Sequence, residues 1–182
     1  FLNPTPGIWR IRVYNESDFS SIYDCWLPLT PFISEDTFFL QPDPFITICD
    51  PGNTPQLICT SAFSHTTGGI YPYSSRGFSR SGSITPTIAA PGVNIYAPSA
   101  TGNYRRVSGT SVAAAHTAGA CLLLMEWGIV RQNHLDLSTN DLKNYLIRGA
   151  RRTEQEYPNP EWGYGSLDVF GVFENLRPTL SR

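Results

Sequence analysis

The sequence predicts an α/β fold that is preceded by part of an antiparallel β unit. The chain has 182 residues, of which 41% are apolar and 15% charged, and this suits one domain or one domain with part of another. Fifteen glycines and fifteen prolines indicate many turns and short strands rather than a helical bundle. The pattern changes near residue 45, from aromatic and proline-rich to short apolar segments followed by helical ones.

Residues 1–44 predict the β unit. Residues 9–14, which read W-R-I-R-V-Y, alternate between apolar and polar side chains with the period of a half-buried strand. Residues 24–28 and 38–40 suggest two further short strands, and we see no helical period in this part. The aromatic side chains Trp9, Tyr14 and Trp26 suit core packing better than a stacking face for a carbohydrate or protein partner.

Residues 45–182 predict the α/β part. Short strands are expected at 45–48, 56–60, 87–90 and 93–96, and a long loop at 65–82. Residues 111–127 are almost all small or apolar, which predicts a helix that is buried on all sides. Residues 138–148 predict an amphipathic helix, with Ser138 as its N-cap, Asp141 as the capping-box partner, Leu142, Tyr145 and Leu146 on one face, and Gly149 at its end.

Charge and composition argue against several function classes. The formal net charge of −2 gives no basic excess for a nucleic-acid duplex. Four cysteines without a C-x-x-C pair, and only three histidines, favour buried free thiols over a zinc site or a disulfide scaffold. The longest apolar stretch, residues 113–125, is too short to span a bilayer, so no membrane span is expected.

Ser111 is the residue whose position in the sequence best suits a catalytic role. It follows Gly109 and Thr110 at the start of the long apolar helix, where backbone N–H groups are unpaired and the helix dipole is positive. A serine there can attack a carbonyl while its own N–H stabilises the resulting oxyanion, and Gly109 lets a substrate backbone approach closely. On composition alone, an ordinary helix cap explains the same residues better.

Resemblance to a known family favours the nucleophilic serine over the ordinary helix cap. Residues 107–120 read V-S-G-T-S-V-A-A-A-H-T-A-G-A and resemble the segment around the nucleophilic serine of subtilisin-like serine proteases, G-T-S-M-A-[AS]-P-H-V-[AS]-G. Four more segments resemble elements of that family in the same order, at residues 57–62, 73–77, 85–95 and 163–168. The sequence departs from the family at Val112, Ala115 and Phe78, where methionine, proline and proline are usual.

The resemblance implies a function and a set of site residues. Ser111 would be the nucleophile and the backbone oxyanion donor, Gly109 would line the substrate cleft, and Thr110 would support the site from behind. The substrate would be a protein or peptide, and the chemistry requires neither a cofactor nor a metal ion. An α/β-hydrolase is rejected, because that fold needs an acid and then a histidine far beyond the serine.

A narrower resemblance concerns the N-terminal part. Residues 7–14 and 23–28 resemble the jelly-roll insert of clostridial germination proteases, which interrupts the protease domain before its serine-bearing half. This implies that residues 1–44 are the C-terminal part of the insert and residues 45–182 the C-terminal half of a subtilisin-like parallel-sheet domain. It also suggests a spore-associated or cytoplasmic location in a bacterium.

The other catalytic residues of the family are missing from this sequence. Subtilisin-like proteases carry the triad in the order Asp, His, Ser, and neither upstream motif is found here, nor is the oxyanion asparagine. His65 lies in a loop pattern, His116 resembles the family's structural histidine, and His134 is expected in solvent. We therefore expect a fragment that is inactive alone and that needs the N-terminal half of the same protein; the alternative is a pseudoprotease that serves as a scaffold.

Overall fold

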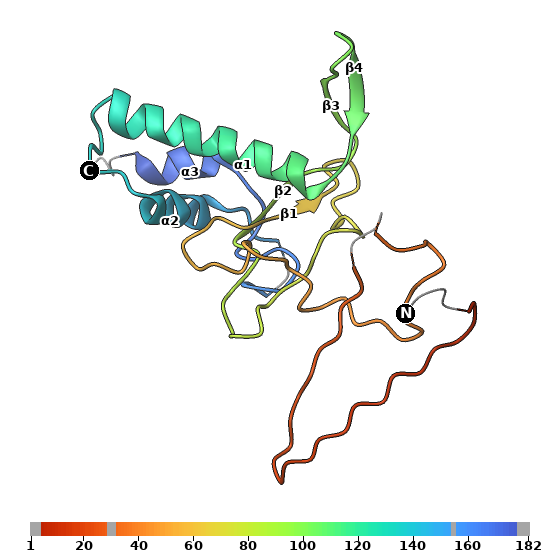
Figure 1. Cartoon of the computed structure of the whole chain (residues 1–182). Helices are drawn as coiled ribbons and strands as arrows, with labels where there is room; N and C mark the ends of the chain where they lie inside the picture. Colours follow the sequence, from red (N-terminus) through yellow and green to blue (C-terminus); the bar gives the residue numbers. More distant parts are fainter. Residues whose placement is uncertain (1–4, 29–31, 154–155, 178–182) are drawn as a thin grey trace. The chain divides into compact units, whose positions relative to one another are not determined.

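The computed structural model describes residues 5–28, 32–153 and 156–177 (Figure 1). The chain divides into two compact units, residues 1–42 and residues 43–182. The regular elements all belong to the second unit. They are the strands β1 (Thr60–Phe63), β2 (Ile88–Pro91), β3 (Ile95–Pro98) and β4 (Tyr104–Val107), and the helices α1 (Thr110–Met125), α2 (Thr139–Gly149) and α3 (Val169–Leu176), with a π-helical turn, η1 (Glu126–Val130), after α1.

A small parallel sheet forms the centre of the second unit. β1 and β2 pair in parallel, with Thr60 opposite Ile88 and Ala62 opposite Ala90. Residues 163–167 continue the sheet beside β2, because the N–H of Ala89 donates to Gly165 O at 2.9 Å and the N–H of Leu167 donates to Ala89 O at 2.7 Å. Ile88, Ala89 and Ala90 are all fully buried, as expected for a parallel strand that is covered on both faces.

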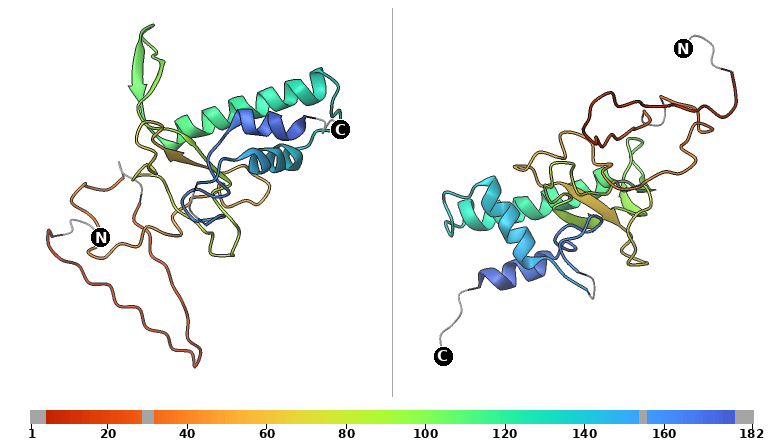
Figure 2. Two further views of the ribbon diagram at one scale, coloured as in Figure 1. Left: turned by 180° about the vertical axis from the view of Figure 1, so that it is seen from behind. Right: turned by 90° about the horizontal axis from the view of Figure 1, so that it is seen from below.

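The three helices pack beside this sheet. Figures 1 and 2 show β1 and β2 beside the N-terminal part of α1, with α2 and α3 gathered along its remainder. Ala113 of α1 contacts Ala62 and Ala90, while a second cluster joins the helices to β2 through Ile88, Ala120, Leu124, Leu146, Ala150 and Val172. The helix pair α2–α3 meets closely at Gly149, where an added Cβ would lie 2.4 Å from Val172 Cα.

The amphipathic helix was predicted well. Ser138 caps α2, its N–H donating to Asp141 Oδ2 at 2.9 Å while the Asp141 N–H donates to Ser138 Oγ at 3.3 Å, so the capping box is confirmed. The Ser138 hydroxyl, which donates to Asp141 Oδ2 at 2.6 Å, and then the Ser138 N–H hold the pKa of Asp141 below its usual value. Leu146 is fully buried, and Leu142 and Tyr145 pack against the core as expected.

Helix α1 corrects one prediction. It begins one residue earlier than expected, but it is buried along a single stripe, Ala113, Thr117, Ala120 and Leu124, rather than on all sides. The spacing of four, three and four residues is that of one helix face. Leu122, Leu123 and Met125 are exposed, because the elements of this chain cover only the face that meets the sheet and α2.

Strand positions were predicted less well than helices. Residues 45–48 form no strand, and Ile46 adopts a positive φ of 54° that breaks the extended run. The strand expected at 56–60 starts only at Thr60, since residues 51–57 form turns. β2 lies within one residue of its prediction, β3 starts two residues late, and residues 65–82 form the expected loop. β4 and α3 were not predicted.

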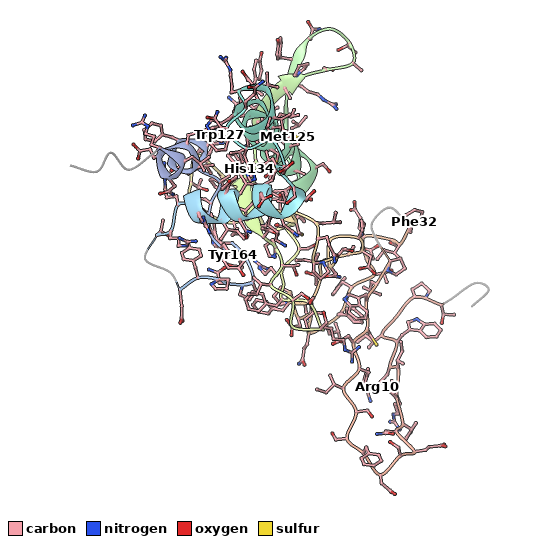
Figure 3. All side chains as sticks on the ribbon, turned by 90° about the vertical axis from the view of Figure 1, so that its left-hand side faces the viewer. Arg10, Phe32, Met125, Trp127, His134 and Tyr164 are labelled. Carbon is pink, nitrogen blue, oxygen red and sulfur yellow. The ribbon has the colours of Figure 1, made fainter. Side chains whose placement is uncertain are left out.

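The first unit contains no strand within residues 5–28 and 32–42. Residues 9–14, 24–28 and 38–40, where strands were expected, form no regular secondary structure, so these three predictions are wrong. Trp9, Tyr14 and Trp26 are exposed rather than packed in a core. Figure 3 shows side chains such as Arg10 projecting from this open segment.

The cysteines and the apolar helix add two further findings. All four cysteines are free, but Cys25 and Cys49 are exposed and only Cys59 and Cys121 are half-buried, where burial raises the pKa of both thiols.

α1 and η1 together form a 21-residue apolar helix, Thr110–Val130, with a mean hydropathy of 1.4, which is long enough to cross a membrane. One such helix is weak evidence, since core helices also meet this criterion, so the absence of a membrane span stays a prediction.

Candidate active site

Ser111 lies at the second position of α1, and its side chain is exposed. The first helical N–H groups that find acceptors are those of Val112 and Ala113, which donate to Gly109 O at 3.1 and 3.3 Å. The N–H of Ser111 therefore has no acceptor within the helix, as is usual in a first turn. An exposed hydroxyl and a free N–H on the same residue are what an attacking serine needs.

Gly109 shapes the corner before the serine. Its φ of 153° and ψ of 161° lie in a region that side chains disfavour, so glycine is required for the turn from the extended chain into α1. Its N–H donates to Gly92 O at 2.8 Å. Gly92 is itself confined, since an added Cβ would lie 2.7 Å from Ala62 Cβ and 2.8 Å from Gly109 O.

A two-stranded ribbon fixes the same corner from the other side. β3 and β4 pair in antiparallel fashion, and in their innermost pair Ile95 follows the end of β2 by four residues while Val107 precedes the start of α1 by three. At the base of the ribbon the N–H of Asn94 donates to Ser108 Oγ at 2.9 Å. Ser111 is thus held by β2, by the ribbon and by α1 together.

The five family-like segments come together in the second unit. Residues 57–62 include most of β1, residues 85–95 contain β2, residues 163–168 form the neighbouring extended segment, and residues 107–120 enter α1. The segment at 73–77 joins them, because the N–H of Ala62 donates to Ser74 Oγ at 3.2 Å. Segments that resemble the family one by one along the sequence are therefore also neighbours in the fold.

No general base accompanies Ser111 among the residues that the structure describes. The Nδ1 of His116 lies 3.1 Å from Val112 O, and His65 is exposed in its loop. His134 is not simply solvated as expected, since its Nδ1 lies 3.0 Å from the hydroxyl of Tyr145, whose ring also contacts Trp127 of η1 (Figure 3). The same described residues contain no group of three possible metal ligands.

The sequence analysis expected a strand near β3 but missed β4, and with it the β3–β4 ribbon. It carries the aromatic side chains Tyr96 and Tyr104 and the two arginines Arg105 and Arg106 close to the start of α1. A signal was present, because Gly102 and its polar neighbours Thr101 and Asn103 separate two short segments that contain the strand-forming residues Ile95, Tyr96, Tyr104 and Val107.

Comparison with known proteins decides the family. The model of the family described as "Subtilase family" matches residues 43–165. The chain belongs to the subtilase family. A structural match agrees with this: the CspB protease of Clostridium perfringens is 36% identical, with a TM-score of 0.74 that covers 80% of this chain and 32% of that one. The α/β subtilase fold, with a parallel sheet and a small antiparallel sheet, is thereby confirmed.

Curated relatives of this subtilase chain are peptidases. The C5a peptidase of Streptococcus pyogenes is 30% identical over 146 residues, which are 76% of this chain and 12% of that protein. Subtilisin-like protease 1 of Plasmodium berghei is 31% identical over 88 residues, which are 48% of this chain and 14% of that protein. The subtilase chain thus spans less than a sixth of these relatives, which are named as a peptidase and a protease.

Proposed function

We propose that Ser111 is the nucleophile of an Asp-His-Ser triad that hydrolyses peptide bonds in a protein or peptide substrate. The observation that carries the proposal is the corner at the start of α1. There an exposed hydroxyl and an N–H without a helical acceptor belong to one residue, within a segment that resembles the serine signature of the subtilases.

The chemistry follows from this placement. Ser111 Oγ bonds to the substrate carbonyl carbon and gives its proton to a histidine base, while the Ser111 N–H binds the carbonyl oxygen as it becomes negative. The C–N bond then breaks, the amine leaves with the proton, and water hydrolyses the acyl-enzyme. Gly109, which has no side chain to block the approach, lines the cleft, and the half-buried Thr110 supports the corner.

We propose further that the histidine, its aspartate and the oxyanion asparagine come from the N-terminal half of the same protein. Two observations support this: none of the three histidines bonds to the Ser111 hydroxyl, and the chain spans only 32% of the CspB chain. The outer face of α1 also agrees, because Ala114, Ala118 and Leu122 are exposed there. The 182-residue chain alone should then be almost inactive.

Residues 1–44 are proposed to be the end of an inserted jelly-roll unit, and residues 45–182 the serine-bearing half. The alternating pattern of residues 9–14 supports this, as does the exposure of the apolar side chains in the same segment, which would pack against other strands of the insert. If the chain shares the subgroup of the germination proteases, it acts in a bacterial spore or in the cytoplasm.

The test is a serine substitution in the full-length protein. Ser111→Ala should lower kcat by about a thousandfold or more while the melting temperature stays nearly constant, because the hydroxyl is exposed. Ser81→Ala is the matched control, since it removes an exposed hydroxyl that lies in a loop and pairs there with the hydroxyls of Ser79 and Ser83. Retained turnover in Ser111→Ala would exclude the serine as nucleophile.

A folded full-length protein that cleaves no peptide would favour the alternative function, a pseudoprotease that acts as a scaffold. In that case the upstream sequence should lack the aspartate or the histidine, and Ser111→Ala should leave the binding of its partner unchanged.

A further inference from the structure

The β3–β4 ribbon projects from the start of α1, and Figure 1 and the left view of Figure 2 show it leaving the rest of the second unit. Its side chains are mostly exposed, with Tyr96 and Tyr104 at 67% and 61% exposure and Arg105 and Arg106 also exposed. Large aromatic side chains at such exposure lose hydrophobic stabilisation, so their grouping on one ribbon calls for a partner.

The strand pairing places three of these side chains on one face. Tyr96 lies opposite Arg106, and Pro98 lies opposite Tyr104, so these four residues alternate onto the same side of the ribbon. The rings of Tyr96 and Tyr104 stack with a centroid distance of 5.2 Å and an angle of 15°. The result is a flat aromatic surface with the Arg106 guanidinium beside it.

The ribbon is also a local excess of positive charge. Residues 95–107 contain two arginines and no acidic residue, although the chain as a whole carries a net charge of −2. None of the ion pairs formed between described residues includes Arg105 or Arg106. Arg106 lies on the aromatic face, whereas Arg105, which is opposite Ala97, lies on the other face of the ribbon. A guanidinium group without an acidic partner is suited to a carboxylate, which it can bind with two parallel hydrogen bonds.

Chain geometry limits the distance between this surface and the serine. Arg106 precedes Ser111 by five residues, and an extended chain reaches at most about 18 Å over that length. A peptide that is bound in extended form rises by about 3.3 Å per residue, so a side chain up to roughly five residues from the bond at Ser111 can reach the ribbon.

We propose that the ribbon, through Tyr96, Tyr104, Arg105 and Arg106, is a specificity-determining site that selects peptide substrates with acidic side chains within about five residues of the scissile bond. This inference rests on the proposed peptidase function. Arg106 pairs with a substrate carboxylate, and the stacked tyrosines on the same face pack against the apolar stem of that side chain. Arg105, on the other face, adds to the positive charge of the ribbon.

The test compares two fluorogenic peptides in the full-length enzyme. They share a cleaved sequence and differ only in two glutamates or two glutamines placed three to five residues from the bond. The wild type should show a kcat/KM about tenfold higher for the glutamate peptide at low ionic strength, corresponding to about 1.4 kcal/mol, and the preference should shrink with added salt. The double variant Arg105→Ala/Arg106→Ala should remove the preference for the glutamate peptide. The double variant Arg105→Glu/Arg106→Glu should instead prefer a third peptide, in which two lysines replace the glutamates.

Arg131→Ala/Arg148→Ala is the matched control, because it removes two exposed arginines from elsewhere in the second unit and should keep the preference. Equal cleavage of both peptides by the wild type would overturn the inference and leave the peptidase function intact. If neither peptide is cleaved, the peptidase function fails. Fluorescence anisotropy of the same peptides then decides the inference, which survives only if the glutamate peptide binds more tightly and loses this advantage in the arginine double variant.

Discussion

The two units of this chain treat similar apolar patterns in opposite ways. In the second unit, Ile88 on β2 is fully buried between β1, residues 163–167 and the helices. In the first unit, Ile11 lies in an equally strand-like segment and is 82% exposed. The difference teaches that an alternating pattern marks side chains that suit a packed sheet, whereas their burial depends on whether other elements pack against them.

Helix α1 shows the same contrast within one element. Leu124 is 1% exposed and packs in the core, while Leu122, two positions earlier, is 65% exposed. Both leucines were expected to be buried, because a helix that is apolar all round is typical of a core. A face of small and apolar residues without cover is what the proposed N-terminal half of a subtilase would contact.

The largest expected effect contrasts the two isoleucines in the 182-residue chain. Ile88→Ala should lower the free energy of unfolding by about 2–5 kcal/mol, because it leaves a cavity in the core. Ile11→Ala should change it by less than about 0.5 kcal/mol, since the side chain is exposed. Urea denaturation measures both, and Ile88→Val, at about 0.5–1.5 kcal/mol, serves if the alanine variant does not fold. Equal costs at the two positions would contradict the contrast.

The next effect concerns the corner that holds Ser111. Gly92→Ala should destabilise the chain by about 1–3 kcal/mol, because the new methyl group would press on Ala62, Ala113 and the carbonyl of Gly109. Thermal unfolding measures this cost. Gly69→Ala is the control in an open loop, where the nearest atom to the added Cβ is 3.8 Å away. An unchanged stability for Gly92→Ala would show that the corner is looser than described.

A smaller change in stability is expected for Gly119→Ala, and its sign depends on whether another part of the full-length protein covers α1. Gly119 lies within α1 with nothing inside 4 Å of an added Cβ, so Gly119→Ala should stabilise the 182-residue chain by up to about 1 kcal/mol through helix propensity. In the full-length protein the same change should be destabilising if another segment packs closely on this face. Stabilisation by the same amount in both proteins would argue against a covering partner.

The smallest effect is a pH dependence at the start of α3. The Gly171 N–H donates to Asp168 Oδ1 at 3.0 Å, and this hydrogen bond, aided by Arg151, holds the pKa of Asp168 below its ordinary value. A carboxyl whose pKa is lower in the folded state stabilises it above the unfolded pKa of about 3.9, and this stabilisation is lost as pH falls through the folded pKa. Asp168→Asn should therefore be less stable than the wild type near pH 6, with the difference shrinking below pH 4. A difference that stays constant from pH 6 to pH 3 would exclude the carboxylate as its source.

Local signals explain which parts of the fold could be predicted. α2 carries its own cap, face and end in Ser138, Leu146 and Gly149, so its sequence was sufficient. β1 was displaced because residues 51–57 form turns that the apolar run did not reveal. α3 was missed because a helix of eight residues is too short for a periodic pattern, although Asp168 is a good N-cap.

The candidate site was predictable only where its residues are neighbours in the sequence. Gly109, Thr110 and Ser111 are neighbours in the sequence, so a local signature could identify them together. Gly92 and the β3–β4 ribbon join the site through contacts across the fold, such as the hydrogen bond from Gly109 N–H to Gly92 O. A linear signature carries no information on such contacts.

Labelling of Ser111 by a fluorophosphonate tests the central claim most directly, because this reagent bonds only to serines that are activated by a base. Peptide mapping should find the label on Ser111 in the full-length protein and should find almost none on the separate 182-residue chain, whose histidines lie elsewhere. Rapid labelling of the 182-residue chain would contradict the proposed division of the catalytic residues, and a label on a different serine of the full-length protein would contradict the assignment of the nucleophile.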